Sequence, residues 1–302
     1  MSGPLFTILL PVLRPPDLLP FAIESVLAQT LTDFELCVVC DGAPPETADC
    51  ARRYGERDPR VKVFAFEKGE RHGEAHRHAV LEQSSARYVT HMSDDDLWFP
   101  DYLAQSAKLM ETADFGNLLQ LEIGLSGDLL LRDGDLANPA TRRKMLDEKW
   151  NFFGPAVASY RLSAYRDLPV GWAPAPLDVW TDLHMWRKLL RVDGLAFATR
   201  FVIEAVKISA AGREDMSLKA RREEIRSFAG TIAGQDERDA LREAAFRAGL
   251  NRMSENCEAL QAQGEELRRQ RDLLKAELER SQKKLDRLTL GPARRFLSAP
   301  FR

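Results

Sequence analysis

Residues 7–42 read TILLPVLRPPDLLPFAIESVLAQTLTDFELCVVCDG and predict a strand, a helix and a second strand in close succession. The compact apolar run Leu5–Leu10, which Pro11 ends, is typical of a buried strand. Asp17–Gln29 carries apolar side chains at helical spacing, and Glu35–Cys40 is a second apolar run of strand length. A strand, a helix and a strand in this order indicate a parallel βαβ unit.

The same alternation continues to about residue 112 of the chain. Further strands are predicted at Val61–Phe66 and Arg87–Met92, and further helices at Thr47–Tyr54, Glu74–Gln83 and Pro100–Glu111. Strands that alternate with helices of this length predict an α/β fold, in which helices cover both faces of a parallel sheet.

Beyond this region the pattern is less regular. The predicted elements are a strand at Leu118–Ile123, a hairpin at Gly127–Asp128, a helix at Thr181–Leu190, and late strands at Ala196–Phe201 and Ala205–Ile208. After Gly212 the chain becomes helical and highly charged. This change in composition predicts that the α/β domain ends at residue 211.

Composition excludes several classes of protein. The chain has 302 residues, of which 44% are hydrophobic and 29% charged, which is an ordinary globular composition. The longest apolar run, Pro4–Leu13, is too short to cross a bilayer and lacks the basic start of a signal peptide, so we expect a cytoplasmic protein. A net charge of −3 gives no reason to expect nucleic acid as a partner.

Cys37 and Cys40 form a C-x-x-C motif. Such a pair is compatible with redox or zinc chemistry. The two cysteines lie in the predicted strand Glu35–Cys40, where residues three apart point to opposite faces, and no second pair of ligands follows. We therefore expect buried thiols that act as small hydrophobic side chains.

Acidic side chains follow two of the predicted strands. Asp41 follows the second strand, and Asp94, Asp95 and Asp96 follow the fourth. Ligands of parallel α/β sheets bind beyond the carboxyl ends of the strands. Clustered carboxylates repel one another unless a cation is present, and Mg²⁺ or Mn²⁺ prefers oxygen ligands together with a diphosphate. The alternative is a solvated helix cap.

Three motifs in this order and spacing resemble family 2 glycosyltransferases. They are S-V-L-A-Q-T at residues 25–30, D-F-E-L at residues 33–36 and S-D-D-D at residues 93–96. Members of the family are inverting enzymes of the GT-A fold, a Rossmann-like nucleotide-diphospho-sugar transferase fold. The resemblance covers about the first 110 residues well and the next hundred weakly.

The resemblance implies a role for each matching residue. Asp41 matches the residue that recognises the nucleotide base, Asp94 lies where the family contacts the ribose, and Asp95 matches the ligand of a Mn²⁺ or Mg²⁺ ion that bridges the donor diphosphate. The loop beneath the nucleotide is matched by Pro11, Val12, Leu13 and Arg14. This chain departs from the common D-D-G-S and D-x-D motifs, because Cys40 and Ser93 replace the first aspartate of each.

A second segment, Thr181–Leu189, resembles the family motif E-D-x-x-x-W-x-R-L. Inverting transfer needs one base, which takes the proton from the acceptor hydroxyl as it attacks the anomeric carbon. The aspartate of the motif is that base, so the resemblance implies this role for Asp182. The alternative from the residues alone is that Thr181 and Asp182 cap a helix.

A basic run lies at the start of the predicted helix Glu74–Gln83. Because helix N-termini favour phosphates, we expect Arg71, His76 and Arg77 to contact the nucleotide sugar. A zinc site on His72 and His76, or simple exposure to solvent, is the alternative. Seven aromatic residues farther along the chain are compatible with an acceptor-sugar site or with a core under a long loop: Trp150, Phe152, Phe153, Tyr160, Trp172, Trp180 and Trp186.

The C-terminal segment keeps a heptad pattern from Met253 to Thr289. One core position is occupied by Leu260, Leu267, Leu274, Ser281 and Leu288, and the other by Cys257, Gly264, Arg271, Leu278 and Leu285. The predicted organisation is a GT-A domain (1–211), a helical extension (212–252), a coiled coil that makes the protein a homo-oligomer (253–290), and a basic and aromatic tail (291–302). The tail is compatible with peripheral contact to an anionic membrane or with an unstructured end.

The sequence therefore predicts a metal-dependent inverting glycosyltransferase of the hexosyltransferase type. The expected donor is a nucleotide sugar, a UDP-sugar first, and the expected acceptor is a glycan or a lipid-linked saccharide in surface polysaccharide or glycoconjugate synthesis. One alternative is a non-catalytic scaffold with the same fold. The other, a nucleotidyltransferase, needs a glycine-rich loop after the first strand, and Leu10–Pro16 contains no glycine.

Overall fold

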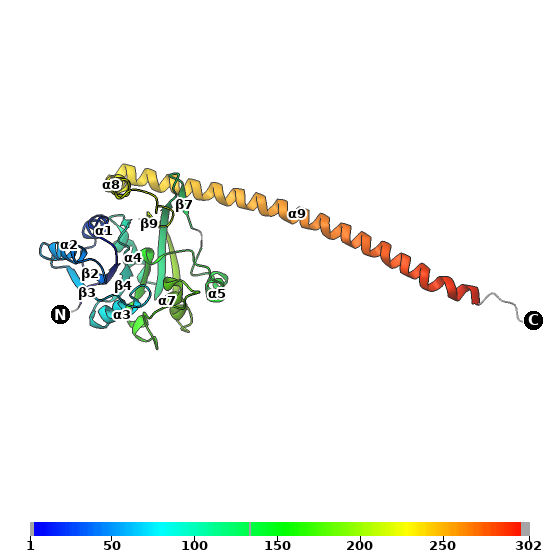
Figure 1. Cartoon of the computed structure of the whole chain (residues 1–302), viewed down its shortest axis with the longest axis horizontal. Helices are drawn as coiled ribbons and strands as arrows, with labels where there is room; N and C mark the ends of the chain where they lie inside the picture. The colour runs from blue at the N-terminus through cyan, green and yellow to red at the C-terminus, as the bar shows by residue number, and fades with distance from the viewer. Residues whose placement is uncertain (1–2, 133, 297–302) are drawn as a thin grey trace, which may run out of the picture. The chain divides into compact units, whose positions relative to one another are not determined.

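The computed structural model describes residues 3–132 and 134–296, with side chains described as far as residue 286. The chain divides into two compact units, Met1–Gly249 and Leu250–Arg302. The first unit contains a sheet covered by helices, and the second consists of the greater part of one long helix (Figure 1).

Within the described residues, the strands form a single mixed sheet in the order β3-β2-β1-β4-β8-β6-β9-β5, and β7 pairs with β6. The strands are β1 (Phe6–Val12), β2 (Phe34–Asp41), β3 (Val61–Phe66), β4 (Tyr88–His91), β5 (Asp96–Trp98), β6 (Phe115–Ile123), β7 (Leu129–Leu131), β8 (Ala158–Arg161) and β9 (Phe197–Lys207).

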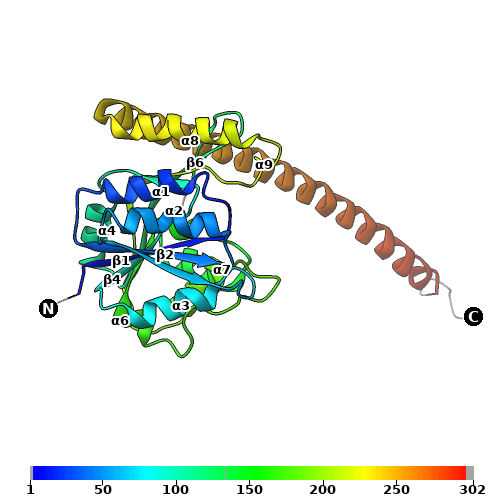
Figure 2. The same ribbon diagram turned by 60° about the vertical axis from the view of Figure 1, so that its left-hand side comes forward.

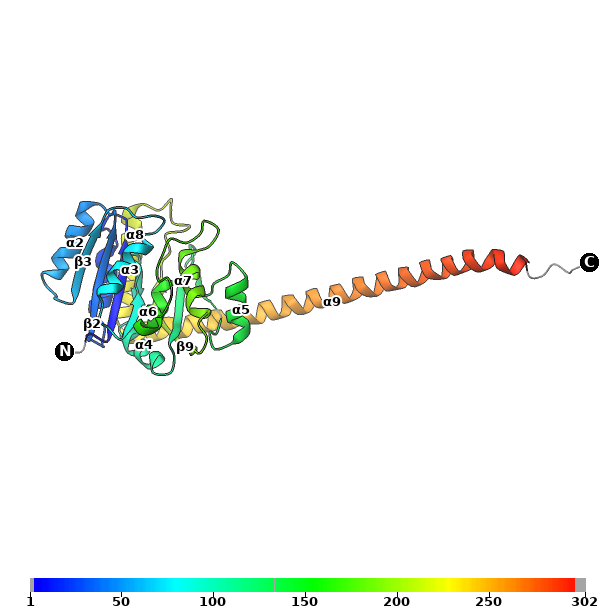
Figure 3. The same ribbon diagram turned by 90° about the horizontal axis from the view of Figure 1, so that it is seen from below.

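Helices cover both faces of this sheet. They are α1 (Leu19–Leu27), α2 (Pro45–Gly55), α3 (Glu74–Gln83), α4 (Tyr102–Met110), α5 (Pro139–Asp147), α6 (Leu162–Arg166), α7 (Thr181–Leu190), α8 (Leu218–Ala233) and α9 (Gln235–Phe296), with a short 3₁₀ helix at Pro155–Val157. Figure 2 shows α1 and α2 on one face of the sheet and α3 and α6 on the other. Helix α5 packs against α7 (Figure 3).

The predicted parallel sheet is confirmed for β1 to β4, and β6 also pairs in parallel with β9. Strand β1 pairs in parallel with β2 and β4, and β2 pairs in parallel with β3. The other half of the sheet is mixed, because β8 runs antiparallel to both β4 and β6, and β5 runs antiparallel to β9. The two predicted late strands are one strand, β9, whose pairing with β6 shifts register at Leu118–Gln120.

Strand β2 shows why the parallel half is stable. All eight of its residues are buried, as expected for a central strand with helices on both faces. Cys37 and Cys40 lie in this strand at 2% and 1% exposure, and burial raises the pKa of the Cys37 thiol to about 12. The expected burial of both thiols is confirmed, and the raised pKa favours the thiol form of Cys37 over the more reactive thiolate.

The helical extension belongs to the first compact unit as far as Gly249. Ile225 and Ile232 of α8 and Ala245 of α9 belong to a buried apolar cluster that also contains residues of the sheet. The guanidinium of Arg242 donates a hydrogen bond of 2.9 Å to Glu204, which fixes α9 to β9. The compact unit is therefore longer than the segment predicted as the GT-A domain, residues 1–211.

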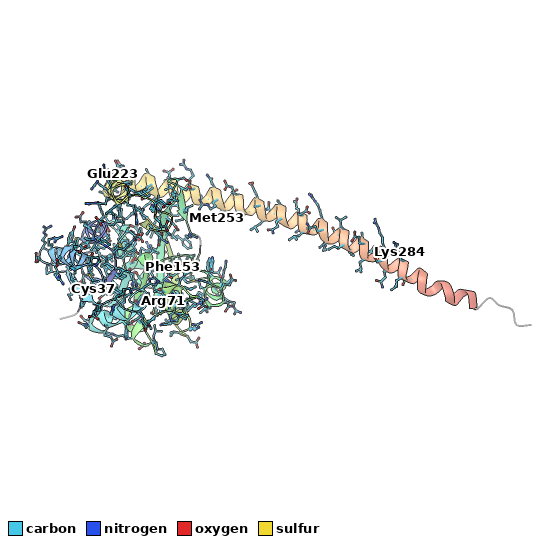
Figure 4. The ribbon with its side chains drawn as sticks, in the orientation of Figure 1. Cys37, Arg71, Phe153, Glu223, Met253 and Lys284 are labelled. Carbon is cyan, nitrogen blue, oxygen red and sulfur yellow. The ribbon has the colours of Figure 1, made fainter. Side chains whose placement is uncertain are left out.

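The described part of α9 beyond residue 250 exposes its apolar residues. Leu260, Leu267, Leu274 and Leu278 are 58–67% exposed, and Met253 and Lys284 lie on the same helix (Figure 4). The predicted tail, residues 291–302, lies outside the described side chains. No helix in the described part of the chain is long and apolar enough to cross a membrane.

Candidate functional site

A cavity of about 600 Å³ opens where β1, β4 and β9 end and α7 begins. Of the residues that the sequence predicts to act on a ligand, Pro11, Arg71, Arg77 and Asp182 line it. The remaining predicted residues do not line the cavity: Val12, Leu13, Arg14, Asp41, His76, Asp94 and Asp95. The structure therefore separates the predicted site into this cavity and two neighbouring clusters of charged side chains.

Asp182 lies in the first turn of α7. One carboxylate oxygen accepts a hydrogen bond of 3.0 Å from the Asn151 side chain, and the other accepts one of 2.8 Å from the backbone N–H of Leu183. The N-cap of α7 is Trp180, so Thr181 and Asp182 do not occupy the capping position. Burial raises the pKa of Asp182, which suits a carboxylate that takes up a proton during a reaction.

Glu74 of α3 holds the start of α7 in place. Its side chain is fully buried and accepts hydrogen bonds of 2.8 Å from the Thr181 hydroxyl and 3.0 Å from the His72 backbone N–H. Burial favours the protonated form of Glu74, but hydrogen bonds from its own backbone N–H, from Thr181 and from His72, together with the nearby charge of Arg77, outweigh burial, and the pKa of Glu74 lies below its usual value. The position of Asp182 therefore depends on a residue more than a hundred positions earlier in the chain.

Asp94 and Asp95 are ion paired with arginine. Arg14 donates to both oxygens of Asp94, and its guanidinium lies 3.0 Å from Asp95. Arg221 of α8 approaches Asp95 at 3.5 Å. Burial raises the pKa of Asp94, and the ion pair with Arg14 opposes this effect. Arg221 lies outside every motif, so the sequence analysis did not predict it.

The third aspartate of the cluster has a structural partner. An Asp96 oxygen accepts a hydrogen bond of 3.1 Å from the backbone N–H of Ile208, which ties β5 to the end of β9. Burial, with a smaller effect of Asp95, raises the pKa of Asp96 to about 7. No group of three or more His, Cys, Asp or Glu residues in the described part of the chain is arranged to hold a metal ion by itself.

Asp41 is the centre of the second cluster. It accepts hydrogen bonds of 2.7 Å from the Gly69 backbone and 2.8 Å from the Lys68 side chain, and the His76 imidazole lies 3.4 Å away. Gly73 has φ +68°, and a Cβ there would lie 2.5 Å from the Asp41 carboxyl carbon. Asp41 therefore fixes the loop between β3 and α3, and Gly73 permits the close approach.

The basic residues of this loop and of α3 differ in their surroundings. Arg77 is only 8% exposed, donates a hydrogen bond of 2.8 Å to the His72 carbonyl and lies 4.9 Å from the centre of the Trp172 ring. Its Nε has no hydrogen-bond partner among the described residues. His76 instead stacks on Phe66, with ring centres 4.3 Å apart. The zinc alternative for His72 and His76 finds no further ligand in the described residues.

The aromatic segment contributes to both the core and the cavity. Trp186 and Tyr160 are fully buried and contact each other, so they belong to the core. Phe153 and Trp172 are buried and line the cavity, and Trp180 lines it while remaining 49% exposed. Arg71 and Phe153, which line the same cavity, are labelled in Figure 4.

Comparison with known proteins matches residues 7–168 to the family described as glycosyl transferase family 2. A relative from Bacillus subtilis, TuaG, is named as a glycosyltransferase of teichuronic acid biosynthesis. It is 29% identical over 107 residues, which represent 35% of this chain and 42% of TuaG. The chain covers less than half the length of the curated relatives that come first in the comparison.

Solved structures of two proteins share the fold. Residues 1–349 of S. aureus TarS match with a TM-score of 0.56 at 14% identity, covering 82% of this chain and 72% of that one. TarS solved in complex with UDP matches with a TM-score of 0.50. The mannosyltransferase PcManGT of Pyrobaculum calidifontis, solved with GDP-Man and Mn²⁺, matches with a TM-score of 0.50 at 17% identity, covering 88% of this chain and 80% of that one. These likenesses confirm the predicted Rossmann-like GT-A fold with a helical extension.

Proposed function

Because the chain belongs to glycosyl transferase family 2, we propose that its cavity binds a nucleotide-sugar donor and that the chain transfers the sugar, with inversion, to an acceptor hydroxyl. One observation carries this proposal. Asp182, a carboxylate with a raised pKa, faces a cavity of about 600 Å³ that is also lined by the cations Arg71, Arg77 and Lys207. A base beside an anion-binding surface is what sugar transfer from a nucleoside diphosphate requires.

The transfer step uses Asp182 as general base. The acceptor oxygen forms a bond to the anomeric carbon while the bond from that carbon to the diphosphate oxygen breaks. The acceptor proton passes to the Asp182 carboxylate, and the nucleoside diphosphate leaves with the electron pair of the broken bond. Asn151 and the Leu183 N–H orient the carboxylate, and Glu74 fixes the beginning of α7.

For the nucleoside part of the donor, we propose the position that the family resemblance implies, along Pro11–Arg14 and beside Asp41. Arg71 and Arg77 then face the diphosphate from the start of α3. The donors named for the structural neighbours, UDP for TarS and GDP-Man for PcManGT, make UDP- and GDP-sugars the first to test. The name of TuaG supports a saccharide acceptor in polysaccharide synthesis.

The residues present fit a divalent cation at Asp95 that would share its ligands with the donor. Asp94 and Asp95 are two adjacent carboxylates whose charge is balanced by arginine, and Mg²⁺ or Mn²⁺ commonly uses one or two carboxylates together with substrate phosphates. When bound, such an ion supplies positive charge to the leaving diphosphate. Arg14 and Arg221 then have to give up part of their contact with Asp95.

A thermal-shift panel tests the proposed function. UDP, GDP, ADP, CDP and dTDP are each added with Mn²⁺, and at least one is expected to stabilise the protein. Ligand at 100 times its dissociation constant adds about 2.7 kcal/mol to the free energy of unfolding. The matching nucleotide sugars are then assayed for sugar transfer to saccharide acceptors. A folded protein that none of these nucleotides stabilises would instead support the non-catalytic scaffold.

We also propose that α9 forms a coiled coil with further copies of the chain. Leu260, Leu267, Leu274 and Leu278 recur at heptad positions and are exposed, and burying them against a second copy removes apolar surface from water. Arg271 and Gly264 share the seam with them. A buried charge and a helix-weakening glycine make the first half of the seam the weaker one.

Light scattering of the full chain and of a form that ends at Gly249, the last residue of the first compact unit, tests this proposal. At micromolar concentration, the full chain is expected to have the mass of a dimer or trimer, and the shorter form that of a monomer. Leu274→Ser is expected to weaken the oligomer more than Leu273→Ser, a matched change outside the predicted seam. A monomeric full chain, or a truncated form with unchanged oligomeric mass, contradicts the coiled coil.

A further inference from the structure

Lys207, the last residue of β9, lines the cavity but belongs to none of the sequence motifs. It lies in register with Asp96 on β5 and with Glu122 on β6. Its place at the carboxyl end of a strand puts a positive charge at the edge of the sheet where ligands of α/β proteins bind. Asp182 lies near enough for its pKa to be affected by this charge.

Each carboxylate near Lys207 has another partner. Glu122 is ion paired with Arg132 at 3.1 Å, Asp96 accepts the backbone N–H of Ile208, and Asp182 accepts from Asn151 and Leu183. Among the described residues, none of these acids lies within ion-pair distance of the Lys207 ammonium. A partly buried lysine that forms no close ion pair is costly, so its charge points to an anionic ligand.

Arg77 repeats this pattern on α3. It also lines the cavity, it is more than nine-tenths buried, and it makes no ion pair with a carboxylate among the described residues. Its Nε lacks a hydrogen-bond partner there. His91, which lines the cavity as well, does not add charge, because burial lowers its pKa to about 3. Lys207 and Arg77 thus give the cavity two cations that form no close ion pair within the described residues, although Asp96, Asp182 and Glu74 act on them from farther away.

We infer that Lys207 binds the diphosphate of the donor and stabilises the negative charge that grows on it as the nucleoside diphosphate leaves. This inference rests on the proposed function and adds to it a residue from the end of β9, outside the family match of residues 7–168. A neutral acceptor sugar gives no reason for two cavity cations that lack a close ion pair, whereas a diphosphate does. Arg77 would bind the same group from α3.

Isothermal titration calorimetry of the full chain in Mn²⁺ buffer tests the inference. The probes are the nucleoside diphosphate that the wild-type chain binds in the thermal-shift panel, UDP first, and the matching nucleoside monophosphate. Lys207→Met is expected to lower the affinity for the diphosphate about ten- to a hundredfold, the effect of losing one charged hydrogen bond, and to change that for the monophosphate much less. Lys207→Arg keeps the charge and is expected to restore most of the affinity.

Arg132→Met is the matched control, because Arg132 lines the same cavity but already has Glu122 as its partner. Equal losses in Arg132→Met and Lys207→Met, or equal losses for mono- and diphosphate, overturn the specific contact. Should Lys207→Met fail to fold, Lys207→Gln takes its place. If the wild-type chain and Lys207→Met bind the nucleoside diphosphate equally well, the inference about Lys207 is wrong and the proposed function still stands. If the wild-type chain binds none of UDP, GDP, ADP, CDP and dTDP, the proposed function fails with it.

Discussion

Replacing Asp182 by asparagine is expected to lower the rate of sugar transfer about 10²–10⁴-fold, the usual contribution of a general base. Nucleoside diphosphate binding should change little, since the proposed diphosphate contacts come from cations elsewhere in the cavity. Asparagine has the same shape, but its single side-chain oxygen can accept only one of the two hydrogen bonds, from Asn151 or from the Leu183 N–H, so the thermal midpoint should fall only slightly. Transfer kinetics and calorimetry, measured on the same preparations, separate the two effects.

The pH profile gives a second readout for Asp182. The base must be ionised to accept a proton, and burial raises its pKa above that of an exposed aspartate. We therefore expect kcat/KM to fall as the pH is lowered through this raised pKa, and to recover as the pH is raised again. Asp178→Asn, a change of an exposed acid in the preceding loop, should leave both rate and profile unchanged. Near wild-type transfer by Asp182→Asn would contradict the role of general base and show that Asp182 only forms hydrogen bonds at the first turn of α7.

The second large effect concerns the cation. Nucleoside diphosphate affinity is expected to be at least about tenfold higher with Mn²⁺ than with EDTA, because an ion held by Asp95 would attract the negative charge of the diphosphate. Asp95→Asn should remove this difference by weakening binding in Mn²⁺ to the level seen in EDTA. The readout is the calorimetric affinity of the wild-type chain and the variant in both buffers.

Two further variants sharpen this experiment. Asp101 accepts a hydrogen bond from Thr30 and does not line the cavity, so Asp101→Asn should keep the full response to Mn²⁺. Arg221→Gln removes one cation that competes for Asp95, so it should raise the affinity for Mn²⁺. Equal nucleotide affinity in Mn²⁺ and EDTA for the wild-type chain would show that the arginine pairs of Asp94 and Asp95 are not displaced by a metal ion.

Local sequence was sufficient to predict the strands and helices of the parallel half of the sheet. Val61–Phe66 and Glu74–Gln83 in that half, and the later helix Thr181–Leu190, were predicted with the bounds that the structure shows. In these segments the apolar pattern and the flanking turn residues agree with the buried faces. Strands β5 and β8 were missed, because three or four residues are too few to show a period, and their pairing partners lie far along the chain.

The candidate site shows the same division. The motifs identified Asp41, Asp94, Asp95 and Asp182, since each follows a strand or begins a helix within a recognisable segment. Nothing in the sequence indicated Glu74, Lys207 or Arg221, because each acts through residues that are distant in the chain. Long-range partners of this kind leave no spacing that a single sequence can reveal.

The sequence by itself determined the family, the α/β alternation, the candidate base and the heptad pattern at the C-terminus. All of these depend on residues that are neighbours in the chain, where periodicity and motif spacing carry the information. Only the tertiary structure decided which charges have partners. It placed Arg14 and Arg221 on the aspartates, and it left Lys207 and Arg77 facing the cavity with no close ion pair in the part of the chain that the structure describes. A charge is compensated by what lies beside it in space, and in this protein those neighbours come from strands and helices far apart in the sequence.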